Sequence, residues 1–266
     1  MKSIDMHVHT NASDGVLSPK EAIQRAIENG LSGIAITDHD TVMGALSVKG
    51  LTLPDHFTVI QGIEFSTIQN NKEIHILGYH LDLEDESLQK LLKTIRNFRR
   101  DRVHKILDKL ERFNISLTYQ EVLGMEPPDS IGRPHVAKAL VRRGFVRDIP
   151  EAFDRYLSKG RLAYVERYKL ETKEAIELIK RLGGFSVLAH PGLLNQQDIL
   201  SVLEKGIEGM EVYHPKHSRC VTNELYDLAI ARKLIITGGS DFHDFSFGKG
   251  NDIGSHWIPI KNVTTD

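Results

Sequence analysis

The sequence predicts an α/β protein built on a barrel or barrel-like sheet, and three observations support this fold class. Short apolar, β-branched runs recur along the chain and are bounded by glycine, proline or polar residues, as buried strands are. Amphipathic helical patterns separate several of these runs, an alternation typical of parallel βα units. Histidine and acidic residues lie in or just after the runs, and barrel enzymes carry their chemistry at the carboxyl ends of strands. The predicted strands are residues 4–8, 33–37, 58–63, 73–78, 185–189, 209–213 and 234–240.

Caps and apolar faces predict the helices that connect these strands. The first helix begins at Ser18, which is followed by a first-turn proline and the capping-box residue Glu21, and it ends at Gly30. Thr172 is expected to cap a second helix, which Gly183 terminates. The other two predicted helices of this part of the chain are 198–205 and 221–232.

The middle of the chain breaks the alternation, because it carries helical patterns and no convincing strand. One long amphipathic helix is predicted from Leu88 to Leu110. Shorter helices are predicted at 119–123, 134–143 and 150–157. We therefore expect a catalytic barrel formed by residues 1–97 and 161–266, with a helical insertion at 98–160 that lies over the barrel mouth.

Composition excludes several classes of protein. The 266 residues are 40% hydrophobic and 26% charged, as in a globular enzyme rather than a disordered chain. Lys and Arg number 34 against 36 Asp and Glu, so no global basic field drives non-specific nucleic-acid binding. No apolar run reaches the length of a membrane helix, and the N-terminus carries no apolar leader. Cys220 is the single cysteine, which excludes an internal disulfide and fits a reducing cytoplasm.

Histidine carries the functional signal, with 13 residues in the chain. A lone strand histidine is usually a hydrogen-bonded structural residue, but His7 and His9 share one face of a strand and can hold one ion together. Converging imidazoles and carboxylates without a cation would leave several desolvation costs uncompensated. A ligand set without thiolate suits Mn, Fe or Zn. The nine candidate ligands are His7, His9, Asp14, His39, Glu64, His75, His190, Asp241 and His243.

These positions resemble the motifs of the PHP (polymerase and histidinol phosphatase) superfamily. The matching segments are His7-Val8-His9-Thr10, Ser13-Asp14-Gly15, Thr37-Asp38-His39-Asp40, Gly62-Ile63-Glu64, Ile74-His75-Ile76-Leu77-Gly78, Leu188-Ala189-His190-Pro191 and Gly239-Ser240-Asp241-Phe242-His243. The resemblance spans residues 4 to 254 and implies a distorted (β/α)7 barrel, the PHP fold, that holds two to three divalent metal ions.

The resemblance also implies which residues share an ion. His7, His9, Glu64 and Asp241 would hold the first ion. Glu64, His75 and His190 would hold the second, with Glu64 bridging the two. Asp14, His39 and His243 would hold the third.

The resemblance implies a phosphoesterase, and with bridged divalent ions we expect metal-bound hydroxide to attack phosphorus directly. No serine or cysteine nucleophile is then required, and the chain has no Gly-x-Ser-x-Gly elbow. His214 or His217 is a candidate acid for the leaving oxygen, although a structural or substrate-binding role is equally open to them.

Substrate contacts are predicted in the insertion. Arg133 precedes Pro134 at the start of a predicted helix, where a guanidinium and free backbone N–H groups suit a phosphate. His135 would contact a second phosphate or the leaving group. Arg99 and Arg102, three residues apart, are further candidates, although a basic run on a helix is usually only a solvated face. His217 is the remaining candidate contact.

The Gly132-Arg133-Pro134-His135 segment resembles a PHP subgroup of nucleotide phosphatases and 5′→3′ exoribonucleases. The resemblance implies a hydrolase of 3′,5′-nucleoside bisphosphates or short 5′-phosphorylated oligoribonucleotides, with no membrane and no obligate protein partner. One alternative is a histidinol-phosphate phosphatase. The other is a metal-binding regulatory protein without turnover.

Overall fold

The computed structural model describes residues 2–124, 128–245 and 252–259. The chain forms two compact units, one from Met1–Gln89 with Lys169–Asp266 and the other from Lys90–Tyr168. We call them the barrel unit and the helical unit and describe each by itself. The helical unit contains the predicted insertion 98–160, whose exact limits stay a prediction, and the helix α3 (Glu86–Glu111) spans the first boundary between the units. The expected position over the barrel mouth stays a prediction.

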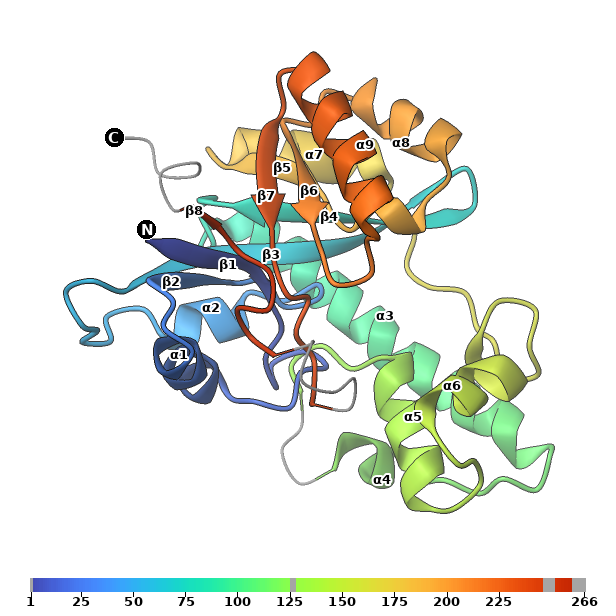
Figure 1. Ribbon diagram of the computed structural model, residues 1–266. Coiled ribbons are helices and arrows are strands. Elements are labelled where there is room, and N and C mark those ends of the chain that lie inside the picture. Colours follow the sequence, from blue (N-terminus) through green and yellow to red (C-terminus); the bar gives the residue numbers. More distant parts are fainter. Residues whose placement is uncertain (1, 125–127, 246–251, 260–266) are drawn as a thin grey trace. The chain divides into compact units, whose positions relative to one another are not determined.

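The barrel unit is a nearly closed sheet of eight described strands in the order β7-β6-β5-β4-β3-β2-β1-β8 (Figure 1). An isolated parallel bridge joins Val8 to Phe242, and the His9 amide donates to the Phe242 carbonyl at 3.0 Å. The first strand therefore lies beside the segment that follows β7, which brings the two ends of the sheet together. The strands are β1 (Ser3–Val8), β2 (Gly33–Ile36), β3 (Thr58–Gln69), β4 (Lys72–Tyr79), β5 (Phe185–Leu188), β6 (Gly209–Tyr213), β7 (Ile235–Gly238) and β8 (Ile258–Pro259).

The expectation of a parallel sheet is wrong for β4. This strand pairs antiparallel with β3 and with β5, whereas β1, β2 and β3 are parallel, as are β5, β6 and β7. β3 continues past its expected end at residue 63, and Asn70 and Asn71 then turn the chain with φ of 50° and 62°. Two consecutive residues with positive φ form the tight hairpin turn for which asparagine is favoured, so no helix separates these strands.

The helices of the barrel unit lie outside the sheet. Helix α1 has the expected capping box between Ser18 and Glu21, and Gly30 follows its end with φ of 77°. Thr172 does not cap α7; Glu171 does, and the Thr172 hydroxyl hydrogen-bonds that of Thr67 at 2.8 Å. The elements are α1 (Pro19–Glu28), α2 (Met43–Ser47), α7 (Thr172–Arg181), the 3₁₀ turn η2 (Pro191–Leu193), α8 (Gln196–Leu203) and α9 (Arg219–Ala231).

Apolar side chains on the strands fill the interior of the barrel unit. Ile4, Met6, Leu77 and Val187 are all buried and belong to one hydrophobic cluster. The hydroxyl of the buried Tyr79 donates to the Met6 carbonyl at 2.7 Å, so its polar end is satisfied within the core. This core holds the strands in register and thereby fixes where their carboxyl ends lie.

The helical unit has its own hydrophobic core. Val103, Ile106 and Leu110 of α3 pack with Val136 and Leu140 of α5, and every buried member of this cluster belongs to the unit. The remaining elements are α4 (Tyr119–Leu123), α5 (Arg133–Arg142), α6 (Ile149–Ala152) and the π-helical turn η1 (Phe153–Leu157). Within the described ranges, no helix of either unit has the length and hydropathy needed to cross a bilayer.

Candidate metal centre

The barrel topology brings the nine predicted ligands into one cluster, which we call the nine-residue cluster. They come from six strands or the segments that follow them, far apart in sequence. His7 and His9 lie at the end of β1, Asp14 in the loop after β1, His39 after β2, Glu64 in β3, His75 in β4, His190 after β5, and Asp241 and His243 after β7. Parallel strands end on the same edge of a barrel, which is why most of these segments meet. His75 of the antiparallel β4 reaches Glu64 through the pairing of β4 with β3, in which it lies opposite Ser66.

Glu64 lies at the centre of the cluster, and its side chain is 1% exposed. Five imidazoles surround its two carboxylate oxygens. Its Oε2 is 3.4 Å from His7 Nε2, 3.2 Å from His9 Nε2 and 2.9 Å from His39 Nδ1, and its Oε1 is 3.0 Å from His75 Nδ1 and 3.1 Å from His190 Nε2. A carboxylate with this many nitrogen neighbours on both oxygens has the contacts of a bridging ligand.

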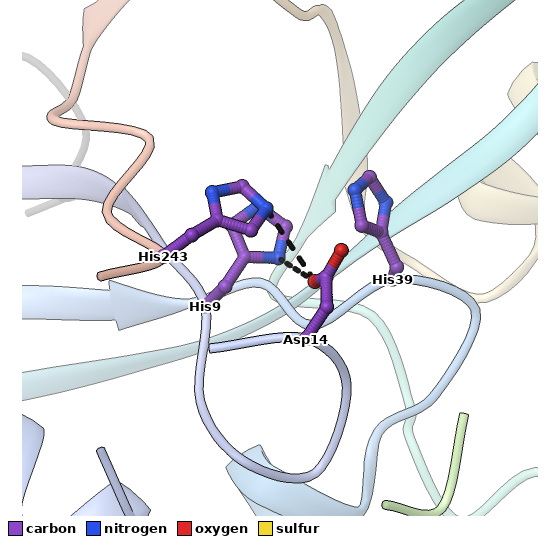
Figure 2. A group of neighbouring side chains, drawn as sticks. All are labelled: His9, Asp14, His39 and His243. Atoms are coloured by element: carbon purple, nitrogen blue, oxygen red, sulfur yellow. Dashed lines mark ion pairs between the residues drawn. The ribbon is translucent and has the colours of Figure 1, made fainter. Parts of the chain in front are cut away.

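Two further groups surround the other carboxylates. Asp241 Oδ1 lies 3.5 Å from His7 Nε2 and 3.4 Å from His9 Nε2. Figure 2 shows the second group, in which Asp14 lies between His9 and His243 on one side and His39 on the other. Asp14 Oδ1 is 3.9 Å from His9 Nδ1 and 3.4 Å from His243 Nε2.

These contacts define three sets of side chains that could each hold an ion. In each set, the candidate ligand atoms all lie within 4.8 Å of one another. His9 belongs to two sets and so does His39, so the sets adjoin. They are His9, Asp14, His39 and His243; His7, His9 and Asp241; and His39, Glu64 and His75.

The donor atoms fit divalent cations better than a hydrogen-bonded network. His9 Nδ1, His39 Nδ1 and Glu64 Oε2 are buried and make no hydrogen bond to any described residue. His39 Nδ1 and Glu64 Oε2 are nevertheless 2.9 Å apart, so they converge without the alignment that a hydrogen bond needs. Buried polar atoms in this condition are costly, and a shared cation would satisfy them.

The close packing of imidazoles and carboxylates shifts the pKa values of both kinds of group in the cluster. Burial acts to raise the pKa of Glu64, but the surrounding imidazoles, above all His39 and His75, outweigh it and hold the pKa well below its usual range. Burial acts to lower the pKa of His9, but the neighbouring carboxylates of Asp241 and Glu64, 3.4 and 3.2 Å from its Nε2, raise the pKa to about 10. The carboxylates thus remain ionised and attract positive charge to the cluster.

Buried carboxylates outside the cluster brace the backbone that carries it. Asp38 accepts hydrogen bonds from the Thr10 amide and hydroxyl, both at 2.8 Å, and from the Ser13 hydroxyl at 2.6 Å, which shapes the loop of Asp14. Asp5 accepts from the amides of His7, Ser240 and Gly254 at 3.1, 2.9 and 2.8 Å. Burial raises the pKa of Asp5 to about 6 in spite of these bonds.

Glu211 and His214 of β6 and the following loop also contact the cluster, and sequence reasoning assigned no role to Glu211. Its Oε1 accepts from His7 Nδ1 at 2.9 Å, and its Oε2 accepts from the His190 amide at 2.7 Å. His214 Nε2 lies 3.2 Å from Asp241 Oδ2. A signal for Glu211 exists, because a carboxylate interrupts the apolar run Gly209-Met210-Glu211-Val212-Tyr213.

Backbone strain accompanies two of the candidate ligands. His190 and Asp241 both have left-handed backbone, with φ of 33° and 48°. Non-glycine residues adopt this conformation only where the surroundings impose it, and such residues gather at functional sites. Gly239 permits the close approach next to Asp241, because a Cβ there would lie 2.4 Å from the His7 amide nitrogen.

Neither candidate acid has an uncommitted ring nitrogen. His217 Nδ1 donates to the Val212 carbonyl at 2.9 Å, and its Nε2 accepts from the Gly192 amide at 3.0 Å. His214 Nδ1 accepts from the Lys216 amide at 3.1 Å, while its Nε2 faces Asp241. The acid role and the substrate contact of His217 stay predictions, and these contacts argue for a structural role instead.

The predicted substrate residues of the insertion all lie in the helical unit. Arg133 begins α5, with its guanidinium 5.6 Å from the ring centre of Phe153. His135 Nδ1 accepts from the Gly132 amide at 3.1 Å and so caps its own helix. Arg99 Nη1 donates to the Ile131 carbonyl at 3.2 Å. Arg102 is buried and donates from Nε to the Val165 carbonyl at 2.8 Å.

Comparison with known proteins places the chain among phosphoesterases. A family model described as PHP domain matches residues 5–183. The chain is 32% identical over 251 residues to the 5′-3′ exoribonuclease Rnm of Salmonella typhimurium, covering 90% of this chain and 84% of that protein. It is 31% identical to the 3′,5′-nucleoside bisphosphate phosphatase of Chromobacterium violaceum, covering 96% and 91%.

Structural comparison agrees. A protein of Bifidobacterium adolescentis, described as a candidate metal-dependent phosphoesterase, superposes with a TM-score of 0.88 at 28% identity, over 98% of this chain and 94% of that one. Barrel, cluster and relatives together define a metal-dependent hydrolase of phosphoric esters. The chain belongs to the PHP family.

Proposed function

We propose that this protein hydrolyses phosphate esters of small nucleotides, namely 3′,5′-nucleoside bisphosphates, short 5′-phosphorylated oligoribonucleotides, or both. One observation carries the proposal: nine imidazole and carboxylate side chains from separate strands and loops gather at the buried Glu64, and eight of them form three adjoining ligand sets, while His190 joins through its contact with Glu64. The names of the relatives direct the choice of substrate, since one is an exoribonuclease and another a nucleoside bisphosphate phosphatase.

The proposed cofactors are two to three divalent ions, Mn, Fe or Zn. The ligand set contains imidazole and carboxylate and no thiolate, which favours these metals over softer ones. We propose His7, His9, Glu64 and Asp241 for one ion, Glu64, His75 and His190 for a second, and Asp14, His39 and His243 for a third. Such ions, when bound, lower the pKa of water and neutralise charge on a phosphoryl group.

The chain's own residues would hold the reacting groups in place. Glu64 and Asp241 stay ionised and supply negative charge in a buried site, where electrostatic interactions are stronger than in water. Asp38 and Asp5 fix the backbone on either side of the ligands, so the ligand positions are preorganised before substrate arrives.

Arg133 and His135 are the proposed phosphate contacts, with Arg99, Arg102 and His217 as further candidates. Arg133 stands at the N-terminus of α5, where helix amides and a guanidinium together favour an anion. A terminal nucleotide anchored by its phosphate would suit both proposed substrates. We also propose a cytoplasmic location, which the exposed free thiol of Cys220 favours.

A Mn²⁺-supplemented panel of substrates tests the proposal. It compares 3′,5′-bisphosphoadenosine, 5′-AMP, histidinol phosphate and a 5′-phosphorylated trinucleotide, each with and without added Mn²⁺. We expect Mn²⁺-dependent release of phosphate from the bisphosphate or of mononucleotide from the trinucleotide. Preference for histidinol phosphate would support that alternative instead, and no turnover of any substrate would support a metal-binding protein without catalysis.

A further inference from the structure

Strand β6 contributes none of the nine candidate ligands, yet it lies between two strands that do. The sheet order β7-β6-β5 places it between the strands that lead to Asp241 and to His190. Its residue Glu211 is fully buried. A buried carboxylate is costly unless each oxygen finds a partner, so the contacts of Glu211 indicate what it does.

Both oxygens of Glu211 hold a candidate ligand, and the two ligands belong to different proposed ions. Oε1 is 2.9 Å from His7 Nδ1, and Oε2 accepts the His190 backbone N–H at 2.7 Å. The first contact acts on an imidazole ring, and the second acts on a backbone. One side chain therefore links a ligand of the first proposed ion to a ligand of the second.

The contact with His7 determines which ring nitrogen can bind a metal. A carboxylate only accepts hydrogen bonds, so His7 Nδ1 must carry the proton. The lone pair is then on Nε2, the atom that lies 3.4 Å from Glu64 and 3.5 Å from Asp241. Carboxylates in this arrangement fix the tautomer and orientation of metal-binding histidines.

The contact with His190 holds a strained backbone. His190 has φ of 33° and ψ of 53°, which a histidine adopts only under constraint. Its N–H points at Glu211, and its ring Nε2 lies 3.1 Å from Glu64 Oε1. Loss of the hydrogen bond to Glu211 would release this conformation and with it the direction of the ring.

We propose that Glu211 is a positioning residue that orients His7 and His190 together, so that its loss weakens the binding of two ions at once. The inference rests on the proposed metal centre. Glu211 differs from the candidate ligands, because both of its oxygens are occupied by N–H donors.

The test compares Glu211→Gln with the matched variant Glu208→Gln. A glutamine can accept at only one end, so its NH₂ must face either His7 Nδ1 or the His190 N–H. Glu208 is the matched control because it too accepts from a backbone amide, that of Ser186 at 3.1 Å, and within the described residues it has no hydrogen bond or ion pair with any of the nine candidate ligands. Each protein is equilibrated with buffered Mn²⁺, and the bound metal is measured by elemental analysis.

We expect Glu211→Gln to bind Mn²⁺ roughly 10- to 100-fold more weakly, with both ions affected, and Glu208→Gln to match wild type. Wild-type affinity in Glu211→Gln would overturn the proposal, as would the loss of only one ion. Failure of wild type itself to bind at least two ions would refute the proposed metal centre instead.

A second measurement needs no variant at this position. In metal-free wild-type protein with ¹⁵N-labelled histidine, we expect the His7 signal, assigned through His7→Gln, to carry its proton on Nδ1. An unprotonated Nδ1 would overturn the proposal even if Glu211→Gln failed to fold.

Discussion

Glutamate has opposite environments in the two units. In the barrel unit, the Glu64 side chain is 1% exposed and meets five imidazoles. In the helical unit, the Glu121 side chain is 32% exposed, caps its own helix through Thr118 and pairs with Arg143. Interactions between exposed charges are screened by water, whereas those between buried charges are strong and demand compensation. The comparison shows that burial, rather than residue type, turns a glutamate into part of a site.

The largest expected effect is the loss of activity when the buried Glu64 is replaced by glutamine, compared with the same replacement of the partly exposed Glu121. Glu64→Gln removes the central carboxylate, and we expect metal uptake to fall and turnover to drop roughly a thousand-fold, or about 4 kcal/mol. Glu121→Gln should stay within about twofold of wild type, because exposed substitutions have small effects. Steady-state kinetics and elemental analysis of both variants measure this contrast. Equal losses in the two variants would contradict it.

A cavity in the helical unit tests whether the two cores are separate. Leu140 is fully buried among residues of the helical unit alone. We expect Leu140→Ala to lower the free energy of unfolding of that unit by about 2–5 kcal/mol. Amide hydrogen exchange should show lost protection in the helical unit and unchanged protection in β1, β5 and β6. If the barrel strands lost protection equally, the two units would unfold as one.

A smaller effect is expected for the proposed phosphate contact. Arg133→Ala should raise KM roughly tenfold for substrates with a 5′-phosphate while kcat stays near wild type, because a charge-assisted hydrogen bond is lost. Arg142→Ala is the control, because Arg142 lies on the same helix, has no proposed substrate contact and also donates to a backbone carbonyl, that of Glu121 at 2.5 Å. An unchanged KM in Arg133→Ala would remove Arg133 from the site.

The smallest effect concerns acid stability of the helical unit. The Arg147 amide and side chain, and then Arg155, lower the pKa of Glu151 from 4.5 to about 2. Because the pKa is lowered on folding, the stabilisation is complete above pH 4.5 and is lost as the pH falls through about 2. We expect Glu151→Gln to reduce the pH dependence of protection around α6 in this range, as measured by hydrogen exchange. An identical pH profile in wild type and variant would contradict the assignment.

Much of the fold follows from local patterns, and what was missed has local causes. All seven expected strands form, because each is a short apolar run with clear boundaries. The antiparallel direction of β4 was missed because the Asn70-Asn71 turn, which reverses the chain, lies inside a stretch that reads as loop. β8 spans only Ile258–Pro259 and depends on pairing with β1, so its own sequence carries little signal.

For the site, the candidate ligands could be predicted from the sequence, but the residues that hold those ligands in position could not. The i, i+2 spacing of His7 and His9 indicates that they share one face of a strand. Which distant residues join them depends on how the barrel closes. Glu211 could have been noticed as a charge within an apolar run, but its two partners depend on sheet order. The left-handed backbone of His190 likewise follows from tertiary contacts rather than from local preference.

The bridge between Val8 and Phe242 has a consequence for how the protein is made. The first ligands to leave the ribosome, His7 and His9, must wait for Asp241 and His243, which are among the last. A truncated translation product that ends before residue 241 therefore lacks part of the nine-residue cluster. Synthesis would therefore complete the candidate ligand sets only after residue 243 has emerged, because the two ends of the site are so far apart in sequence.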